Sequence, residues 1–302
     1  MKRDFLVIED LNRQEILDLF KRTVELKKDR QKNIPHPTLK GKSLGMIFYK
    51  NSTRTRISFE VGMFELGGQA LYLTSEQLQL ERGETIEDSA RVLSRYLHGI
   101  MIRTYDFKLV EQLAKHASIP VINGLTDKNH PIQVLCDLFT IQERLGKIEG
   151  FTLTYVGDDN NMSYSWMEAA ALLDFQLRLA LPENCSEGRM TELASRDNIQ
   201  FFTDPAEAAK DADILYTDVW VSMGAEDEAD EKRKSLKAYQ INQKLIDLAK
   251  PNALVMHCLP AHRGEEITGD ALDGENSIVF DQAENRLHLQ KALLEKLLSA
   301  SQ

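Results

Sequence analysis

The sequence predicts an α/β protein of two domains, each a parallel sheet with helices on both faces, linked by long interdomain helices. Short apolar runs of strand length alternate with stretches of helical periodicity, the pattern of strands joined by crossover helices. The 302 residues suffice for two cores of ordinary size. A long helical pattern that starts at Pro131 suits a bridge between the two halves.

The first predicted element is a helix with a clear start signal. Asn12 is expected to cap it, and Glu15 is placed to reach back to the cap. Leu11 and Ile16 form the pair of a hydrophobic staple. Ile16 also opens an apolar stripe that continues to about Leu26.

Short apolar runs then predict nine strands. They are Leu44–Phe48, Ala70–Leu73, Ile100–Ile102, Pro120–Ile122, Leu153–Val156, Leu177–Ala180, Ile214–Tyr216, Leu254–Met256 and Ile278–Phe280. Amphipathic stretches such as Ile86–Leu97 and Met167–Leu173 lie between them and predict helices that cover the sheets.

The domain boundary is expected between residues 130 and 150, where Pro131 starts a helix with an apolar stripe from Val134 to Leu145. Residues 1–133 would form the first domain and residues 134–286 the second. A leucine-rich stripe over 287–302 predicts a final helix that completes the first domain. The cleft between two such domains is the default place for a ligand.

Composition excludes several classes of function. A net charge of −10 argues against nucleic acid as a partner, and no apolar run reaches the ~18 residues of a membrane span. The apolar run from Phe5 to Ile8 is too short for a signal peptide. Three widely spaced cysteines indicate a reducing cytoplasm rather than a disulfide framework.

Residues 52 to 56 read Ser-Thr-Arg-Thr-Arg, between the strand-like run that ends at Phe48 and the helix-like run that starts at Ile57. The first turn of a helix leaves backbone N–H groups without partners and carries partial positive charge. Hydroxyls and guanidiniums add further donors. We therefore predict a phosphate site here. The alternative is that Ser52 only caps the helix while Arg54 and Arg56 are solvated.

Other polar residues follow the carboxyl ends of predicted strands, where open parallel sheets bind ligands. They are Arg103, Asp158, Asn160, Asn161, Asp218, His257 and Cys258. His130 and Gln133 lie at the start of a predicted helix, either as ligand contacts or as a helix cap. Neighbouring residues at a strand end point in different directions, so we interpret Cys258 as a substrate-contacting thiol and not as a nucleophile activated by His257.

Asp218 precedes Ser222, Met223 and Gly224, which joins a carboxylate to a hydroxyl and a glycine hinge. The acidic stretch 226–231 is interpreted as an exposed loop, and for Asp227, Glu228 and Asp230 we favour a solvated helix face. The chain has neither a Walker-type lysine motif nor Gly-x-Gly-x-x-Gly. His257 and His262 lie in a Pro-containing loop without an obvious third ligand, so we predict no metal and no cofactor.

These motifs resemble those of the aspartate/ornithine carbamoyltransferase family along essentially the whole chain. The stretch 48–56 is similar to the carbamoyl-phosphate loop of that family, and 130–133 to its second element. Two further motifs distinguish which amine accepts the carbamoyl group. They are Asp218 with 222–224, and the His-Cys-Leu-Pro run 257–260, and both are similar to ornithine carbamoyltransferase signatures. Residues 284–286 match as well.

The resemblance implies a role for each site residue. Carbamoyl phosphate would contact Ser52, Thr53, Arg54, Thr55, Arg103 and His130, with Gln133 and Arg286 at its amide and carbonyl. Ornithine would be held by Asn161, Asp218, Ser222 and Met223, and Cys258 and Leu259 would line the reacting centre. Gln79 aligns with a position that reaches a neighbouring subunit's site, so a homotrimer or a multiple of trimers is implied.

The implied reaction is attack of the neutral δ-amine of ornithine on the carbamoyl carbon. Arg103, His130 and Arg286 would stabilise the developing oxyanion, and the departing phosphate can take the proton of the amine. Tyr164 and Trp166 are bulkier than the family pattern, and the sequence does not choose between Asn160 and Asn161 as the ornithine contact.

Alternatives remain open. One is transfer to another amine, such as putrescine or an N-acylated ornithine, and another is a non-catalytic relative that binds a phosphorylated metabolite. The sequence also leaves the direction of arginine metabolism open.

Overall fold

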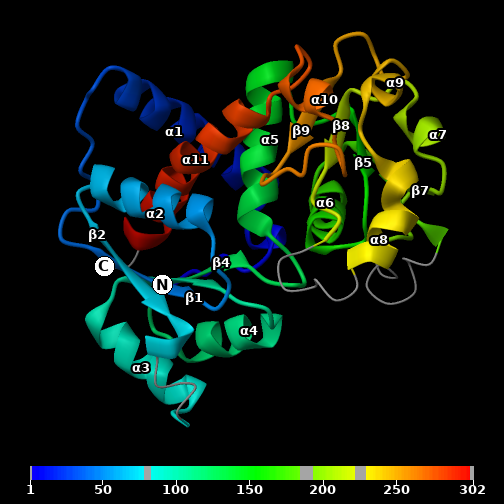
Figure 1. Ribbon diagram of the computed structural model, residues 1–302. Helices are drawn as coiled ribbons and strands as arrows, with labels where there is room; N and C mark the ends of the chain where they lie inside the picture. Colours follow the sequence, from blue (N-terminus) through cyan, green and yellow to red (C-terminus); the bar gives the residue numbers. More distant parts are fainter. Residues whose placement is uncertain (1, 78–82, 184–192, 222–228, 300–302) are drawn as a thin grey trace. The chain divides into compact units, whose positions relative to one another are not determined.

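The computed structural model describes residues 2–77, 83–183, 193–221 and 229–299. The chain divides into two compact units (Figure 1). The first contains residues 1–139 and 284–302, and the second contains residues 140–283. Two long helices, α5 (Pro131–Leu145) and α11 (Val279–Ser299), each have residues in both units.

The first unit is built on a four-stranded parallel sheet in the order β2-β1-β3-β4. Its strands are β1 (Ser43–Phe48), β2 (Gln69–Thr74), β3 (Gly99–Arg103) and β4 (Val121–Leu125). Its helices are α1 (Arg13–Gln31), α2 (Thr53–Glu65), α3 (Ile86–Tyr96) and α4 (Phe107–His116), with α11 returning to it. Short 3-10 turns lie at Ile8–Asp10 and Ser75–Gln77.

Helices cover both faces of this sheet. The α3 and α4 helices pack together on one face, and α1, α2 and α11 lie on the other (Figure 1). Alternation along the strands explains the two cores, since Ile47 and Ile100 belong to the cluster under α3 and α4 while their neighbours point to the opposite face. The predicted capping box is confirmed: Glu15 N–H donates to Asn12, and Asn12 N–H donates to Glu15.

The second unit has a five-stranded parallel sheet in the order β7-β6-β5-β8-β9. Its strands are β5 (Thr152–Val156), β6 (Gln176–Ala180), β7 (Ile199–Phe202), β8 (Ile214–Thr217) and β9 (Leu254–His257). Its helices are α6 (Asn161–Leu172), α7 (Pro205–Ala209), α8 (Ala229–Leu236), α9 (Gln243–Ile246) and α10 (Gly269–Asp273), with a 3-10 turn at Lys237–Tyr239. Trp166 of α6 packs on Tyr216, and Ala208 of α7 on the opposite face.

The predicted fold class is confirmed, and eight of the nine predicted strands coincide with observed ones. The ninth prediction is wrong. Ile278 N–H donates to Val255 at 3.0 Å, but the chain then enters α11 at Val279 instead of continuing beside β9. Strand β7 was not predicted, because only half of its residues point to the core: Gln200 and Phe201 are exposed.

The division between the units falls after Phe139, within the interval 130–150 in which the boundary was expected, and before Glu284, close to the suggested residue 287. Both observed divisions lie inside helices, where the sequence carries no break. Of the acidic stretch 226–231, residues 229–231 lie in α8, where Asp230 is exposed as expected for a solvated helix face, and residues 226–228 lie outside the described residues. The part of the chain that the structure describes contains no candidate for a membrane-spanning helix.

Candidate active site

The candidate residues of the first unit gather where its strand order reverses. From β1 the chain passes to β2 on one side, and β3 and β4 follow on the other, so the carboxyl ends of β1 and β3 form a topological switch point. Phe48 is paired with Arg103 across these ends, and Tyr49 N–H donates to the Arg103 carbonyl at 2.9 Å. Ser52 follows β1, and Arg103 ends β3.

The start of α2 is organised by hydroxyl contacts. Ser52 is its N-cap: Thr55 N–H donates to Ser52 Oγ at 3.3 Å, and Ser52 Oγ–H donates to Thr55 Oγ1 at 3.0 Å. Thr55 is fully buried. The helix begins at Thr53, so Arg54 lies in its first turn together with the N–H groups that helices leave for anions. Capping by Ser52 and anion binding are thus compatible, not alternatives.

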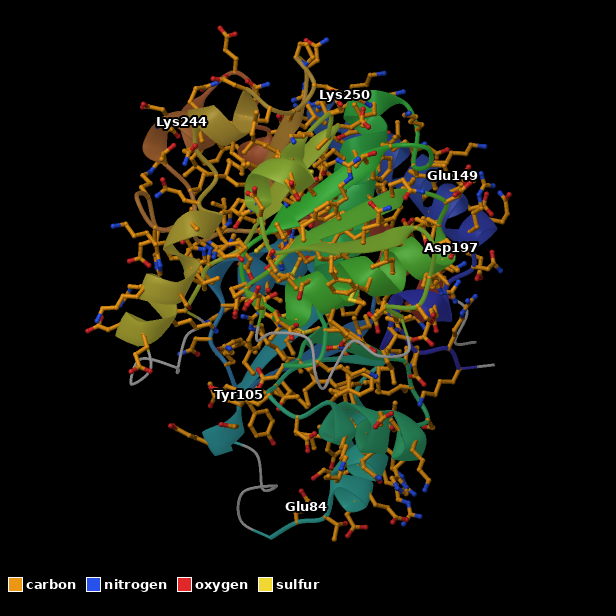
Figure 2. All side chains as sticks on the ribbon, turned by 90° about the vertical axis from the view of Figure 1, so that its right-hand side faces the viewer. Glu84, Tyr105, Glu149, Asp197, Lys244 and Lys250 are labelled. Carbon is orange, nitrogen blue, oxygen red and sulfur yellow. The ribbon has the colours of Figure 1, made fainter. Side chains whose placement is uncertain are left out.

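The two arginines of the motif have different surroundings. Arg56 is exposed, with its guanidinium carbon 3.8 Å from the ring centroid of Tyr72 and its Nε 3.0 Å from Glu60. It is therefore engaged in surface contacts. Arg54 is half-buried. Nearby, Lys50 Nζ lies 5.3 Å from the ring centroid of Tyr105, a half-exposed side chain that follows β3 (Figure 2).

A buried cationic group lies beside the start of α2. Arg103, His130 and Arg286 are each at most 5% exposed, and Arg286 Nη2 donates to Thr55 Oγ1 at 2.8 Å. Burial lowers the pKa of His130 well below its usual value, and the charges of Arg286 and Arg103 lower it further. His130 is therefore a neutral donor or acceptor between two permanent cations. Such a set suits an oxyanion.

The side chain of Gln133 is fixed by one hydrogen bond and keeps a hydrogen-bond acceptor available. It lies in the first turn of α5, and its Nε2 donates to Asp137 at 2.9 Å. The Gln133 side chain is buried, and its Oε1 has no hydrogen-bond partner among the described residues. A buried acceptor of this kind is costly unless a ligand satisfies it. An amide NH₂ group would do so.

The second unit repeats this arrangement at its own switch point, between β5 and β8. Asp218, directly after β8, is the centre of a small hydrogen-bond network. Cys258 Sγ–H donates to Asp218 Oδ1 at 2.9 Å, and Asn160 Nδ2 donates to Asp218 Oδ2 at 3.2 Å. Asp218 Oδ1 also accepts from Val219 N–H at 2.8 Å. The thiol is thus hydrogen-bonded to a carboxylate.

The two neighbouring asparagines have distinct environments. Asn160 is the N-cap of α6: its Oδ1 accepts from Met162 N–H and Ser163 N–H, and also from the Tyr155 hydroxyl at 3.2 Å. With its Nδ2 on Asp218, its side chain is fully engaged. Asn161 is the first residue of α6 and half-buried.

An acidic group surrounds Asp218. Burial raises the pKa of Asp158 even though Lys232 of α8, 2.5 Å away, opposes the shift. Burial and the charges of Asp218 and Asp158 raise the pKa of Tyr155 well above its usual range. The Asp158–Lys232 pair was not predicted, since the two residues are far apart along the chain and Lys232 lies in a generally charged stretch.

The loop after β9 is held by a buried histidine. Leu259 has a left-handed backbone with φ of 58°, and its N–H donates to His257 Nδ1 at 2.8 Å. Since Nδ1 accepts, the proton is on Nε2, which donates to Glu266 Oε1 at 3.0 Å. His257 and Glu266 are fully buried. Glu266 was not identified from the sequence, because its position there is typical of an acidic residue in an exposed loop.

Two groups of side chains among the described residues are close enough to share a metal ion: Asp218, His257 and Cys258, and His262, Glu265 and Glu266. In the first group both His257 nitrogens are already hydrogen-bonded. In the second, Glu266 Oε1 accepts from His257 Nε2–H and from His262 N–H. The side chains of His257 and Glu266 are thus already used in hydrogen bonds that hold the loop after β9. The absence of a metal stays a prediction.

Three predicted site residues, Gln79, Ser222 and Met223, lie outside the described residues. The bulky residues of α6 have a packing explanation. Trp166 is fully buried, with ring centroids 5.3 Å from Tyr216 and 6.1 Å from Phe175, so it fills the space between α6 and the sheet. Tyr164 is half-buried.

Both halves of the chain match models of known domains. Residues 3–143 match the carbamoyl-P binding domain of aspartate/ornithine carbamoyltransferase, and residues 149–297 match its Asp/Orn binding domain. An ornithine carbamoyltransferase from Syntrophus aciditrophicus is 52% identical, covering 99% of this chain and 100% of that protein. A relative from Pyrococcus furiosus described as an anabolic ornithine carbamoyltransferase is 50% identical over 97% of this chain and 95% of its own.

Solved structures agree. The ornithine carbamoyltransferase from Pyrococcus furiosus superposes with a TM-score of 0.94 at 49% identity, covering 99% of this chain and 97% of that one. Family models span nearly all of the sequence, and the strands that they cover end in the motifs described above. The chain therefore belongs to the aspartate/ornithine carbamoyltransferase family.

Proposed function

We propose that this chain transfers the carbamoyl group of carbamoyl phosphate to the δ-amine of L-ornithine, giving L-citrulline and phosphate. The observation that carries the proposal is the buried set of Arg103, His130 and Arg286 beside the hydroxyls of Ser52 and Thr55. The names of the relatives, ornithine carbamoyltransferases over almost their full lengths, support the same acceptor.

In the first unit, the phosphate binds at the start of α2. Ser52, Thr53, Arg54 and Thr55 supply hydroxyls, a guanidinium and the N–H groups of the first helical turn. The carbamoyl oxygen accepts from Arg103, His130 and Arg286, and its amide donates to Gln133 Oε1. The neutral state of His130 and the available acceptor of Gln133 support these two assignments.

In the second unit, Asp218 pairs with the α-ammonium of ornithine, while Asn161 contacts its α-carboxylate. The engagement of Asn160 in the cap of α6 supports the choice of Asn161. Ser222 and Met223 contribute to the same site, by the resemblance alone. Cys258 and Leu259 line the reacting centre, held there by Asp218 and by the His257–Glu266 pair.

The chemistry then needs no covalent intermediate. The lone pair of the δ-nitrogen forms a bond to the carbamoyl carbon, and negative charge develops on the carbonyl oxygen beside Arg103, His130 and Arg286. The bond from carbon to the phosphate oxygen then breaks, and phosphate leaves with the electron pair. The proton lost by nitrogen goes to a phosphate oxygen, so atoms and charges balance. Orientation and preorganised cations lower the barrier.

A panel of acceptors tests this function directly. The purified chain is given carbamoyl phosphate with ornithine, putrescine or N-acetylornithine, and the ureido product is measured colorimetrically together with phosphate. Citrulline and phosphate should appear in equal amounts with ornithine. Faster turnover of putrescine or N-acetylornithine would show that Asp218 and Asn161 do not select the acceptor, and absence of turnover with every amine would refute the enzyme assignment.

We further propose that the chain assembles as a homotrimer through the face of α2. Ile57 and Phe64 are seven residues apart on one side of that helix and are 52% and 79% exposed; Leu71 on the adjoining strand β2 is also exposed. Apolar side chains gathered in this way typically mark an interface. Light scattering should give three times the 34.4 kDa chain mass, and Phe64→Asp should reduce it. A wild-type monomer would contradict the proposal.

The proposed compartment is the cytoplasm, supported by Cys136 and Cys258, which are present as thiols rather than in a disulfide. The anabolic description of the relative from Pyrococcus furiosus supports a role in arginine biosynthesis.

A further inference from the structure

Helix α11 buries a lysine against α2. Lys291 is fully buried, and its Nζ lies 2.7 Å from Glu65 Oε2 and 3.1 Å from His36 Nε2. Lysine is almost never fully buried unless it is paired. Burial is the largest cause that lowers the pKa of Lys291, and Glu65 opposes this shift without cancelling it. Removal of the ammonium from water therefore offsets part of what the pair contributes. Stability alone is a poor explanation for this arrangement.

The two helices approach closely at this pair. A Cβ at Gly62 of α2 would lie 3.3 Å from Lys291 Cγ and 3.8 Å from Leu287 Cδ1. Leu294 completes the contact, so residues at i, i+4 and i+7 of α11 meet the side of α2 that carries Gly62. Glu65 lies one turn further along α2, within reach of the lysine side chain.

The same two helices carry groups of the phosphate site. Ser52 and Thr55 lie at the start of α2, and Arg286 lies five residues before Lys291 on α11. The 2.8 Å hydrogen bond from Arg286 Nη2 to Thr55 Oγ1 depends on the offset between the helices. A slide by one residue moves a helix by about 1.5 Å along its axis, which is enough to break that bond.

We propose that Lys291 and Glu65 are positioning residues that fix the register of α11 on α2, so that Arg286 meets Thr55 at the carbamoyl-phosphate site. Apolar side chains tolerate sliding, whereas a buried ammonium specifies one offset, because at any other offset Lys291 would lose the carboxylate of Glu65. Glu65 also pairs with Arg30 of α1, so the buried lysine is the partner that sets the offset. This inference rests on the donor site proposed above.

The chain offers a matched control on the same helix. Arg22 of α1 pairs with Glu295 of α11 through Nε at 2.7 Å and Nη2 at 3.0 Å. Glu295 also anchors α11, but its partners are Arg22 and Thr38 and none lies on α2. Loss of this anchor should weaken the fold without changing the register at Arg286.

The test measures two quantities for each variant: affinity for an unreactive phosphonate analogue of carbamoyl phosphate by calorimetry, and the urea midpoint. The double variant Lys291→Met/Glu65→Met replaces the pair by apolar side chains and should keep a midpoint close to the wild type. It should bind the phosphonate at least about tenfold more weakly, as expected for loss of one charge-assisted hydrogen bond. Glu295→Gln should lower the midpoint and leave phosphonate affinity within twofold.

Two outcomes would overturn the inference: phosphonate affinity of the double variant within twofold of the wild type, or equal weakening by Glu295→Gln. If the double variant does not fold, Gly62→Ala serves instead, because its methyl group presses on Lys291 Cγ and should weaken phosphonate binding without breaking the pair. Unchanged affinity in that variant also counts against the inference. Arg286→Gln separates the two proposals, since normal phosphonate binding there would refute the donor site itself.

Discussion

The candidate sites of the two units lie at the same point of a parallel sheet, but their side chains differ in charge: those of the first unit are basic and those of the second are acidic. The first unit surrounds its switch point with Arg103, Arg286 and a neutral His130. The second surrounds its own with Asp218 and Asp158. The fold therefore determines where a ligand binds, and the side chains after the strands determine its charge.

Burial acts on both sites in the same way, by penalising charge. It lowers the pKa of His130 in the first unit and raises that of Asp158 in the second. The guanidiniums on one side and the carboxylate of Asp218 on the other complement the phosphate of one proposed substrate and the ammonium of the other. If this division is right, substitutions in one unit should affect only one ligand.

The largest effect is expected for Asp218→Asn. Loss of one partner of a desolvated charge pair costs ~2–5 kcal/mol, so ornithine affinity should fall at least about thirtyfold. The affinity of the phosphonate analogue, which binds in the other unit, should change by less than twofold. Calorimetry measures both, with ornithine titrated into enzyme that is saturated with phosphonate.

Asp158→Asn is the matched control for that variant. Asp158 is also buried at the carboxyl edge of the sheet, but its charge is paired with Lys232. Its loss should weaken ornithine binding much less. Equal weakening by both variants would mean that general acidity of the edge attracts the amino acid, and parallel loss of phosphonate affinity in Asp218→Asn would make Asp218 a structural residue.

The next effect concerns pH and the first unit. Burial lowers the pKa of His288 from 6.5 to about 4, and His130 shifts in the same direction. A lowered folded-state pKa means that stability is complete above pH 6.5 and is lost as the pH falls towards 4. At ~1.4 kcal/mol per pKa unit, His288 contributes up to about 3 kcal/mol to this loss.

His288→Gln should therefore flatten the dependence of the urea midpoint on pH between 6.5 and 4, as followed by circular dichroism. The control is His262→Gln, whose side chain is 45% exposed compared with 1% for His288. His262→Gln should retain the slope of the wild type. If His288→Gln also retains that slope, the buried histidine is not the source of acid sensitivity.

A somewhat smaller effect is expected for Arg54→Lys, which keeps the charge and removes the planar fork. Loss of one charge-assisted hydrogen bond costs roughly 1.5–3 kcal/mol, so kcat/KM for carbamoyl phosphate should fall about tenfold or more. Arg56→Lys is the control, because Arg56 is engaged with Tyr72 and Glu60. Near-normal kinetics of Arg54→Lys would remove Arg54 from the phosphate site.

The sequence could predict those features of the sites that depend on position after a strand. Arg103 and Asp218 were located because a polar residue directly follows a short apolar run, and parallel sheets gather such residues at one edge. Ser52 was located as a cap because capping chemistry is local. These inferences need only the order of residues along the chain.

Contacts between distant segments were not predictable in this way. Lys232 meets Asp158, and Glu266 meets His257, only because the chain folds back, and neither Lys232 nor Glu266 differs in sequence from a surface residue. The failure at Ile278–Phe280 has the same origin. Three apolar residues fit a strand or the first turn of a helix equally well. In the folded chain, Val279 and Phe280 belong to α11.

The smallest effect is expected for Cys258→Ala, and it tests whether the second unit binds or reacts. Cys258 Sγ–H donates to Asp218 Oδ1 at 2.9 Å, so the thiol proton is held by the carboxylate that we assign to the ammonium of ornithine. Removal of the thiol takes away one hydrogen bond from a weak S–H donor, worth ~1 kcal/mol. KM for ornithine should rise about fivefold, and turnover should persist, because the amine attacks the carbamoyl carbon directly.

Cys258→Ser, which retains a donor to Asp218, should lie closer to the wild type. Mass spectrometry of the wild type during turnover should find Cys258 unmodified. A carbamoylated thiol, or complete loss of turnover in Cys258→Ala, would show instead that both units take part in the chemistry.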